Sequence, residues 1–136
     1  MVVGENIKWV IIEVGEADDV QTAFVAPLTL KLEPGWVGTI VWFVFTPGWA
    51  LDSTDGIQFP AGSGFDGQPQ PDPARANCWS TAAANITPGI AHYTINVRHD
   101  VKGPASTGDP VVENEAPPEL GAAAGTTRIL NLAARA

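Results

Sequence analysis

The fold of this chain is decided by one stretch of sequence, residues 28–59, which reads LTLKLEPGWVGTIVWFVFTPGWALDSTDGIQF. Residues 28–32 alternate leucine with polar side chains, the period-two pattern of a strand with one buried face. Residues 39–45 are apolar at both parities and rich in β-branched and aromatic side chains. That composition favours a central strand that is covered on both faces. Residues 56–59 predict a third, short strand.

Two turns bound the central strand of this stretch. Pro34-Gly35 precedes it and Pro47-Gly48 follows it, and each pair is followed by a tryptophan. Proline fixes φ and glycine tolerates positive φ, so neither residue suits the interior of a strand. The apolar run between the turns is too short for a membrane-spanning helix, which needs ~20 residues. The sequence therefore predicts no membrane span.

The rest of the chain adds strands and one long irregular segment. Strand patterns are clear in residues 7–14 and 91–98, and weaker in residues 20–25, 78–86 and 111–112. Residues 60–77 are rich in glycine and proline and have no period, so they predict a long loop. The expected fold is an all-β, antiparallel Greek-key β-sandwich of about seven or eight strands over residues 1–117. Residues 118–136 are expected to form a linker and a tail.

Composition and charge exclude some classes of partner. A chain of 136 residues is normally one domain. Its formal net charge is −8 and its seven Lys and Arg residues are dispersed, which argues against nucleic acid as a partner. The single cysteine, Cys78, excludes an internal disulfide. Residues 1–6 have no basic region and no long apolar run, so no signal peptide is expected and the cytoplasm is favoured.

The order of the pieces resembles a known family. Residues 24–27 (FVAP), the alternation over 28–32, Pro34-Gly35 and Val41-Trp42 resemble the opening half of cupredoxin domains. Residues 93–97 (YTINV) and 109–114 (DPVVEN) resemble the end of small bacterial cupredoxin-like proteins of unassigned function. The resemblance implies a cupredoxin-like sandwich. Immunoglobulin-like sandwiches share most of these patterns and are the alternative fold.

Copper binding is not expected in spite of this resemblance. Cupredoxins hold copper with two histidines, a cysteine and usually a weak axial methionine. The only methionine here is Met1, and no histidine lies close after Cys78. His92 and His99 are seven residues apart, which would place them on opposite faces of a regular strand. We therefore predict no metal, no cofactor and no catalytic constellation, with Cys78 as a small buried side chain.

Five tryptophans stand out in a chain of this length. Trp9 and Trp42 lie within predicted strands, so both are expected in the core. Three others lie near turns or in a weaker strand: Trp36, Trp49 and Trp79. Exposed aromatic side chains of this kind could stack on sugar rings or anchor a protein interface. These three are the candidate aromatic surface, although burial as lids on the core is the first expectation.

The tail is the second candidate site. After the spacer GAAAG at residues 121–125, apolar side chains return at Ile129, Leu130 and Leu132. They could dock on a partner as a short helix or as an added strand. We expect a non-enzymatic structural or interaction subunit that assembles with a protein partner, or with copies of itself, through sandwich surfaces and this tail. The alternative is a small-ligand module that binds carbohydrate with exposed tryptophans.

Overall fold

The protein is all-β, as the sequence predicts. The structure is a computed structural model, which describes residues 6–107 and 110–118. Within these ranges there is no helix long and apolar enough to cross a membrane. The described strands are β1 (Ile7–Ala17), β2 (Val20–Ala26), β3 (Thr29–Leu32), β4 (Val37–Val44), β5 (Trp49–Leu51), β6 (Ile57–Gln58), β7 (Gln70–Pro71), β8 (Cys78–Ala84), β9 (Gly89–His92), β10 (Thr94–His99), β11 (Gly103–Thr107) and β12 (Val111–Asn114).

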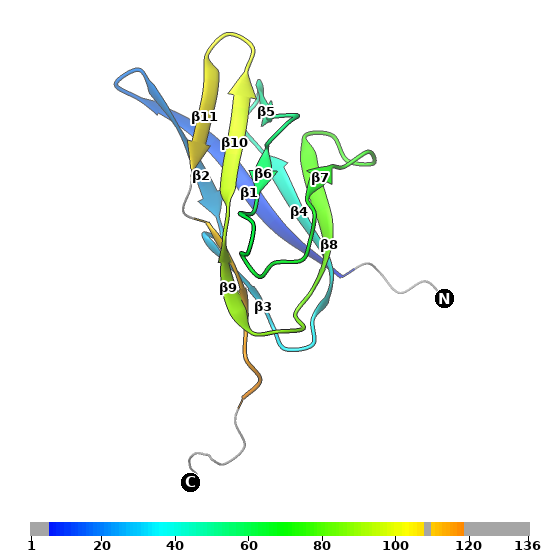
Figure 1. The fold of residues 1–136 in the computed structure, drawn as a ribbon. Coiled ribbons are helices and arrows are strands. Elements are labelled where there is room, and N and C mark those ends of the chain that lie inside the picture. Colours follow the sequence, from blue (N-terminus) through cyan, green and yellow to red (C-terminus); the bar gives the residue numbers. More distant parts are fainter. Residues whose placement is uncertain (1–5, 108–109, 119–136) are drawn as a thin grey trace.

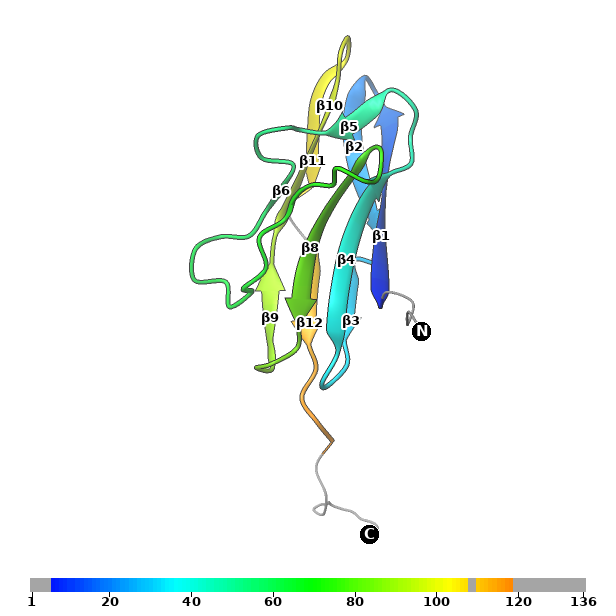
Figure 2. The ribbon, with the colours of Figure 1, turned by 90° about the vertical axis from the view of Figure 1, so that its right-hand side faces the viewer.

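The strands form two layers, an arrangement compatible with a β-sandwich. One layer is a five-stranded sheet in the order β2-β1-β4-β8-β7. The other consists of two small sheets, β11-β10-β5 with β6 paired to β10, and β3-β12-β9. Figure 2 shows β1, β4 and β8 on one side and β9, β10 and β11 on the other. The β1–β2 and β10–β11 hairpins project from the same end of the molecule (Figure 1).

Two strand pairs differ from the antiparallel prediction. β1 pairs with β4 in parallel, with Ile11 beside Phe43, and β3 pairs with β12 in parallel. Parallel neighbours need a long connection. Here β2 and β3 lie between β1 and β4 in the sequence, and eight strands lie between β3 and β12. Such distant pairing leaves no local signature. The Greek-key order and the cupredoxin-like assignment remain predictions.

Several strand boundaries also differ from the sequence prediction. The first strand continues to Ala17, because the turn is confined to Asp18 and Asp19, whose φ angles of 52° and 64° suit a tight hairpin. The strand expected at residues 91–98 divides at Tyr93 into β9 and β10, which belong to different sheets. Strands β5, β7 and β11 were not predicted. The first two have three and two residues, too few for a clear period.

The core lies between the two layers. On β4 the inward residues are Ile40, Trp42 and Val44, so this set forms the core rather than the alternative set Val41, Phe43 and Phe45. Tyr93 at the junction of β9 and β10 meets Trp42 edge to face, with ring centroids 5.8 Å apart. Tyr93, Ile95 and Val97 all point inward. The remaining core side chains come from every part of the described chain: Val10, Ile12, Ala23, Leu30, Leu32, Trp36, Trp49, Leu51, Ile57, Trp79, Ala83, Ala105 and Val112.

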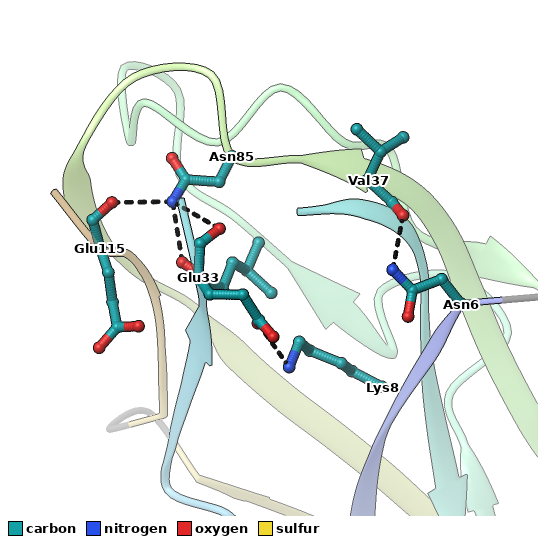
Figure 3. Close-up of polar contacts among 7 residues, drawn as sticks. Asn6, Lys8, Glu33, Val37, Asn85 and Glu115 are labelled. Atoms are coloured by element: carbon teal, nitrogen blue, oxygen red, sulfur yellow. Dashed lines mark hydrogen bonds and ion pairs between the residues drawn. The ribbon is translucent and has the colours of Figure 1, made fainter. Parts of the chain in front are cut away.

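Asn85, just beyond β8, joins segments from both layers. Its Nδ2 donates hydrogen bonds to the carbonyl oxygens of Leu32 (2.8 Å), Glu33 (3.1 Å) and Glu115 (2.9 Å) (Figure 3). Its backbone N–H donates to the Trp36 carbonyl oxygen at 2.8 Å. These bonds fix the ends of β3 and β12 against the start of β4. Asn85 therefore links Glu115, the residue that follows β12, to the end of β3.

The long loop predicted at residues 60–77 is held by the body of the protein. The Phe65 ring stacks on Phe59 with centroids 4.1 Å apart, and Phe59 stacks in turn on Tyr93 at 4.7 Å. Gln68 donates its backbone N–H to Thr81 Oγ1 at 2.9 Å. The only regular part of the loop among the described residues is β7, which pairs with β8. The loop is thus attached to the layers at several points.

Candidate protein interface

The side of the five-stranded sheet that faces away from the core carries apolar side chains on β1, β2 and β4 and reaches Cys78 and Ser80 on β8. Because the core takes Val10 and Ile12 of β1, the odd-numbered residues Trp9, Ile11 and Glu13 point the other way. Strand register then places their neighbours. We call outer face the set Trp9, Ile11, Glu13, Phe24, Ala26, Val41, Phe43, Phe45, Cys78 and Ser80.

Three rows cross this outer face. Phe24 lies beside Glu13 on the neighbouring strand. Phe45 continues β4 by one residue, since its N–H donates to the Ile12 carbonyl oxygen at 2.8 Å, and it extends that row on the other side. The second row runs from Ala26 through Ile11 and Phe43 to Cys78, and the third joins Trp9, Val41 and Ser80. Within the described residues of these rows, Glu13 is the one acidic or basic side chain.

Three aromatic side chains of the outer face are open to solvent. Trp9 is 46% exposed, Phe24 59% and Phe45 62%. Ile11 and Phe43 are half-buried between them, and Val41 is fully covered by its neighbours. In Figure 2 no further layer of described strands lies beyond β1 and β4. The prediction that Trp9 belongs to the core is therefore wrong. The prediction that both faces of the central strand are covered holds at Val41 but not at Phe45, the last residue of the predicted strand.

Cys78 lies at the edge of the outer face in a polar surrounding. It is buried, as predicted. Burial, and then the neighbouring Asp72 carboxylate, raise the pKa of its thiol. Asp72 itself accepts the Ala74 N–H and pairs with Arg75 Nη1, each at 2.8 Å, and these contacts lower the pKa of that carboxyl. A raised thiol pKa keeps Cys78 neutral, so the outer face gains no charge there.

The three tryptophans proposed as an aromatic surface do not form one. Trp36, Trp49 and Trp79 are all buried and belong to the core. Trp36 lies under the Lys8 ammonium group, which is 5.6 Å from the ring centroid, and Trp49 packs on the His99 ring at 5.3 Å. Trp79 points inward beside Trp42 on the adjacent strand. Pro-Gly turns place an aromatic residue at the end of a strand, but the neighbouring layer decides whether its ring is covered.

The remaining polar residues of interest are His92, His99 and Asp52. His92 is exposed on β9, and His99 Nδ1 accepts the backbone N–H groups of Val101 and Lys102 at 3.0 and 3.1 Å. No group of three or more His, Cys, Asp or Glu side chains that could hold a metal ion is found in residues 6–107 and 110–118. Asp52 Oδ1 accepts the Thr54 N–H at 3.0 Å, which stabilises the turn between β5 and β6.

A small hollow of about 250 Å³ lies between the long loop and β9. Its lining includes Phe65, Ile90 and Asn114, and no acidic or basic side chain. The Oδ1 atom of Asn114 is buried there without a hydrogen-bond partner among the described residues. Pockets for small organic ligands usually measure ~300–1,000 Å³. A water molecule would satisfy this single acceptor, so the hollow does not identify a ligand.

The apolar tail residues Ile129, Leu130 and Leu132 lie outside the described residues. A comparison with protein-family models finds no match for this chain, and a comparison with the curated proteins finds none either. Among the described residues, the outer face is the surface on which we base the functional proposal. The sequence signal for it was the apolar character of both parities in residues 39–45, which predicts a covering layer that the described residues do not supply.

Proposed function

We propose that this protein is a non-enzymatic subunit that assembles into a larger protein complex through the outer face of its five-stranded sheet and its C-terminal tail. The observation that supports this most is that three aromatic side chains, Trp9, Phe24 and Phe45, are open to solvent on the same face of one sheet. Covering such an apolar surface with a protein partner is favourable, because it removes apolar side chains from water.

The exposed aromatic surface of the outer face is in the size range of functional apolar patches. A whole aromatic side chain has ~150–250 Å² of surface, so three that are about half exposed leave on the order of 300 Å² of apolar surface in water. Isolated exposed apolar residues are ordinary, but contiguous patches of ~300–600 Å² are often functional. Aromatic residues at the centre of such patches contribute most to binding. Carbohydrate binding has less support, because the tryptophans on which that alternative depended are buried.

Light scattering during size-exclusion chromatography tests the proposal. The wild-type protein is expected to associate as its concentration rises from micromolar to millimolar. Phe45→Asp should abolish association, because it places a charge on the outer face. Val101→Asp is the matched control, because it adds the same charge at a different place. Val101 is 87% exposed in the β10–β11 turn, away from the outer face. A wild-type protein that stays monomeric throughout would contradict self-assembly and favour a small-ligand module.

A further inference from the structure

We infer that the outer face is the receptor for the C-terminal tail of a neighbouring copy, with Ile129, Leu130 and Leu132 seated among Trp9, Phe24 and Phe45. The inference rests on the proposed function and names the partner of that surface. The contact would be heterologous, because the face of one copy meets the tail of the next. Such contacts build rings or open filaments rather than symmetric dimers.

Charge favours the tail as the occupant. Of the seven basic and fifteen acidic residues, residues 119–136 hold two arginines and one glutamate, so the tail has one net positive charge and the remainder has nine net negative charges. The arginines, Arg128 and Arg135, flank the apolar residues of the tail. The acidic side chain of the outer face, Glu13, lies between Phe24 and Phe45. An apolar segment with basic flanks therefore matches an apolar surface with one carboxylate.

Size argues against direct stacking of two outer faces. The patch spans the strands β2, β1, β4 and β8 and, along β1, residues 9–13. At ~4.8 Å between strands and ~3.3 Å per residue, its projected area is on the order of 300–400 Å². Each partner in a standard interface buries ~800 Å². Stacking would also bring two strongly acidic bodies together, whereas a short tail segment needs only the area that is present.

The exit of the chain favours a neighbouring copy over the chain's own outer face. Residues 116–118 follow β12, which belongs to the layer opposite the five-stranded sheet. This segment leaves the end of the molecule along its long axis (Figures 1 and 2). Pro117-Pro118 makes an extended, stiff start to the tail. To reach its own outer face, the chain would have to turn back around the edge of the sheet.

The fluorescence of Trp9 reports directly whether the outer face is covered. It is the exposed member of the five tryptophans, because the other four are buried in the core. Quenching of tryptophan fluorescence by acrylamide therefore reports mainly on Trp9, and Trp9→Phe verifies this. If the tail covers the outer face, quenching should fall as the full chain assembles.

The test compares full-length variants. Substituting Ile129→Asp, Leu130→Asp and Leu132→Asp together should weaken association at least ten-fold and leave Trp9 accessible. The control carries Ala122→Asp, Ala123→Asp and Ala124→Asp in the same tail and should associate more tightly than the first variant by the same factor. Glu13→Gln should weaken association about two- to five-fold and reduce its salt dependence, as expected for an exposed ion pair.

A second experiment uses a synthetic peptide of residues 126–136. Added to the tail variant, it should protect Trp9, and Phe45→Asp in the same background should remove this protection. If the tail variant associates like the wild type while Phe45→Asp does not associate, the inference is wrong and the proposed function stands. A lack of peptide binding at millimolar concentration overturns the inference whether or not the protein assembles. A monomeric wild type whose Trp9 is already protected would show the tail on its own face, which overturns the neighbouring-copy assignment.

Discussion

The indole Nε1–H of Trp42 donates a hydrogen bond to the Tyr93 hydroxyl oxygen at 3.0 Å in the centre of the core. The two residues are 51 positions apart and come from opposite layers. Both side chains are almost completely buried. A buried polar atom without a partner is costly, so each residue fixes the position of the other. This bond therefore specifies how the two layers are aligned.

We expect the Tyr93 phenol to stabilise the fold up to alkaline pH. Burial raises its pKa from 10.0 to about 12, although the Trp42 hydrogen bond acts in the opposite direction. Between pH 10 and 12 the unfolded chain loses a proton that the folded chain keeps. The stabilisation is thus complete below pH ~10 and is lost as the pH rises through the folded pKa. Tyr93 is the only tyrosine, so phenolate absorbance reports it alone. Ionisation at its ordinary pKa in the folded protein would contradict this.

Removing the hydroxyl should be costly by itself. Tyr93→Phe leaves the Trp42 Nε1–H buried and unpaired, which should lower the free energy of unfolding by ~1–3 kcal/mol. The double variant with Trp42→Phe removes both polar partners. The cost of losing the hydrogen bond should then be smaller than in Tyr93→Phe, and urea denaturation of the set measures the coupling between the two residues. Strictly additive effects would argue against this hydrogen bond.

Trp42→Ala should destabilise the protein by ~3–5 kcal/mol, because it leaves a large cavity between the layers. Urea unfolding followed by circular dichroism gives the change in free energy. Trp9→Ala is the matched control, since the same substitution at a side chain that is 46% exposed should cost clearly less. A change below ~1 kcal/mol for Trp42→Ala would show that Trp42 does not occupy the core.

Asn85→Ala should cost ~1–3 kcal/mol, because three carbonyl oxygens lose the Nδ2 donor that they share. Asn85→Asp should cost more, since it also places a negative charge beside those oxygens. Asn6 provides the comparison: its Nδ2 donates to the Val37 carbonyl oxygen at 2.9 Å at an exposed site (Figure 3). Asn6→Ala should therefore change the thermal midpoint little. Equal effects at the two positions would refute the anchoring role of Asn85.

The long loop should be the first site of cleavage when its aromatic anchor is lost. Phe65→Ala removes the ring that stacks on Phe59, while β7 and the Gln68–Thr81 hydrogen bond remain. Limited proteolysis, read by mass spectrometry, should then cut residues 60–70 faster than in the wild type. Val101→Ala, at an exposed turn, should leave the rate in this segment unchanged. An unchanged rate in Phe65→Ala would mean that the stacking does not hold the loop.

The sequence by itself determined most of the segments that form strands and, where one parity is apolar, which residues point inward. On β10 only Ile95 and Val97 alternate with polar residues, so their burial follows from the period of two. The turn at Asp52 was equally local, because a side-chain oxygen two residues before a backbone N–H can accept its hydrogen bond. Local chemistry was sufficient for these features.

Only the tertiary structure decided the rest. In β4 both parities are apolar, so period two shows which side chains share a face but not which face packs on the second layer. The contact between Trp42 and Tyr93 makes one face the core and leaves Phe45 on the other. The parallel pairing of β1 with β4 joins segments that are distant in sequence, where no local preference operates. The candidate interface therefore becomes visible only when the layers are assembled, because exposure is a property of the packed structure.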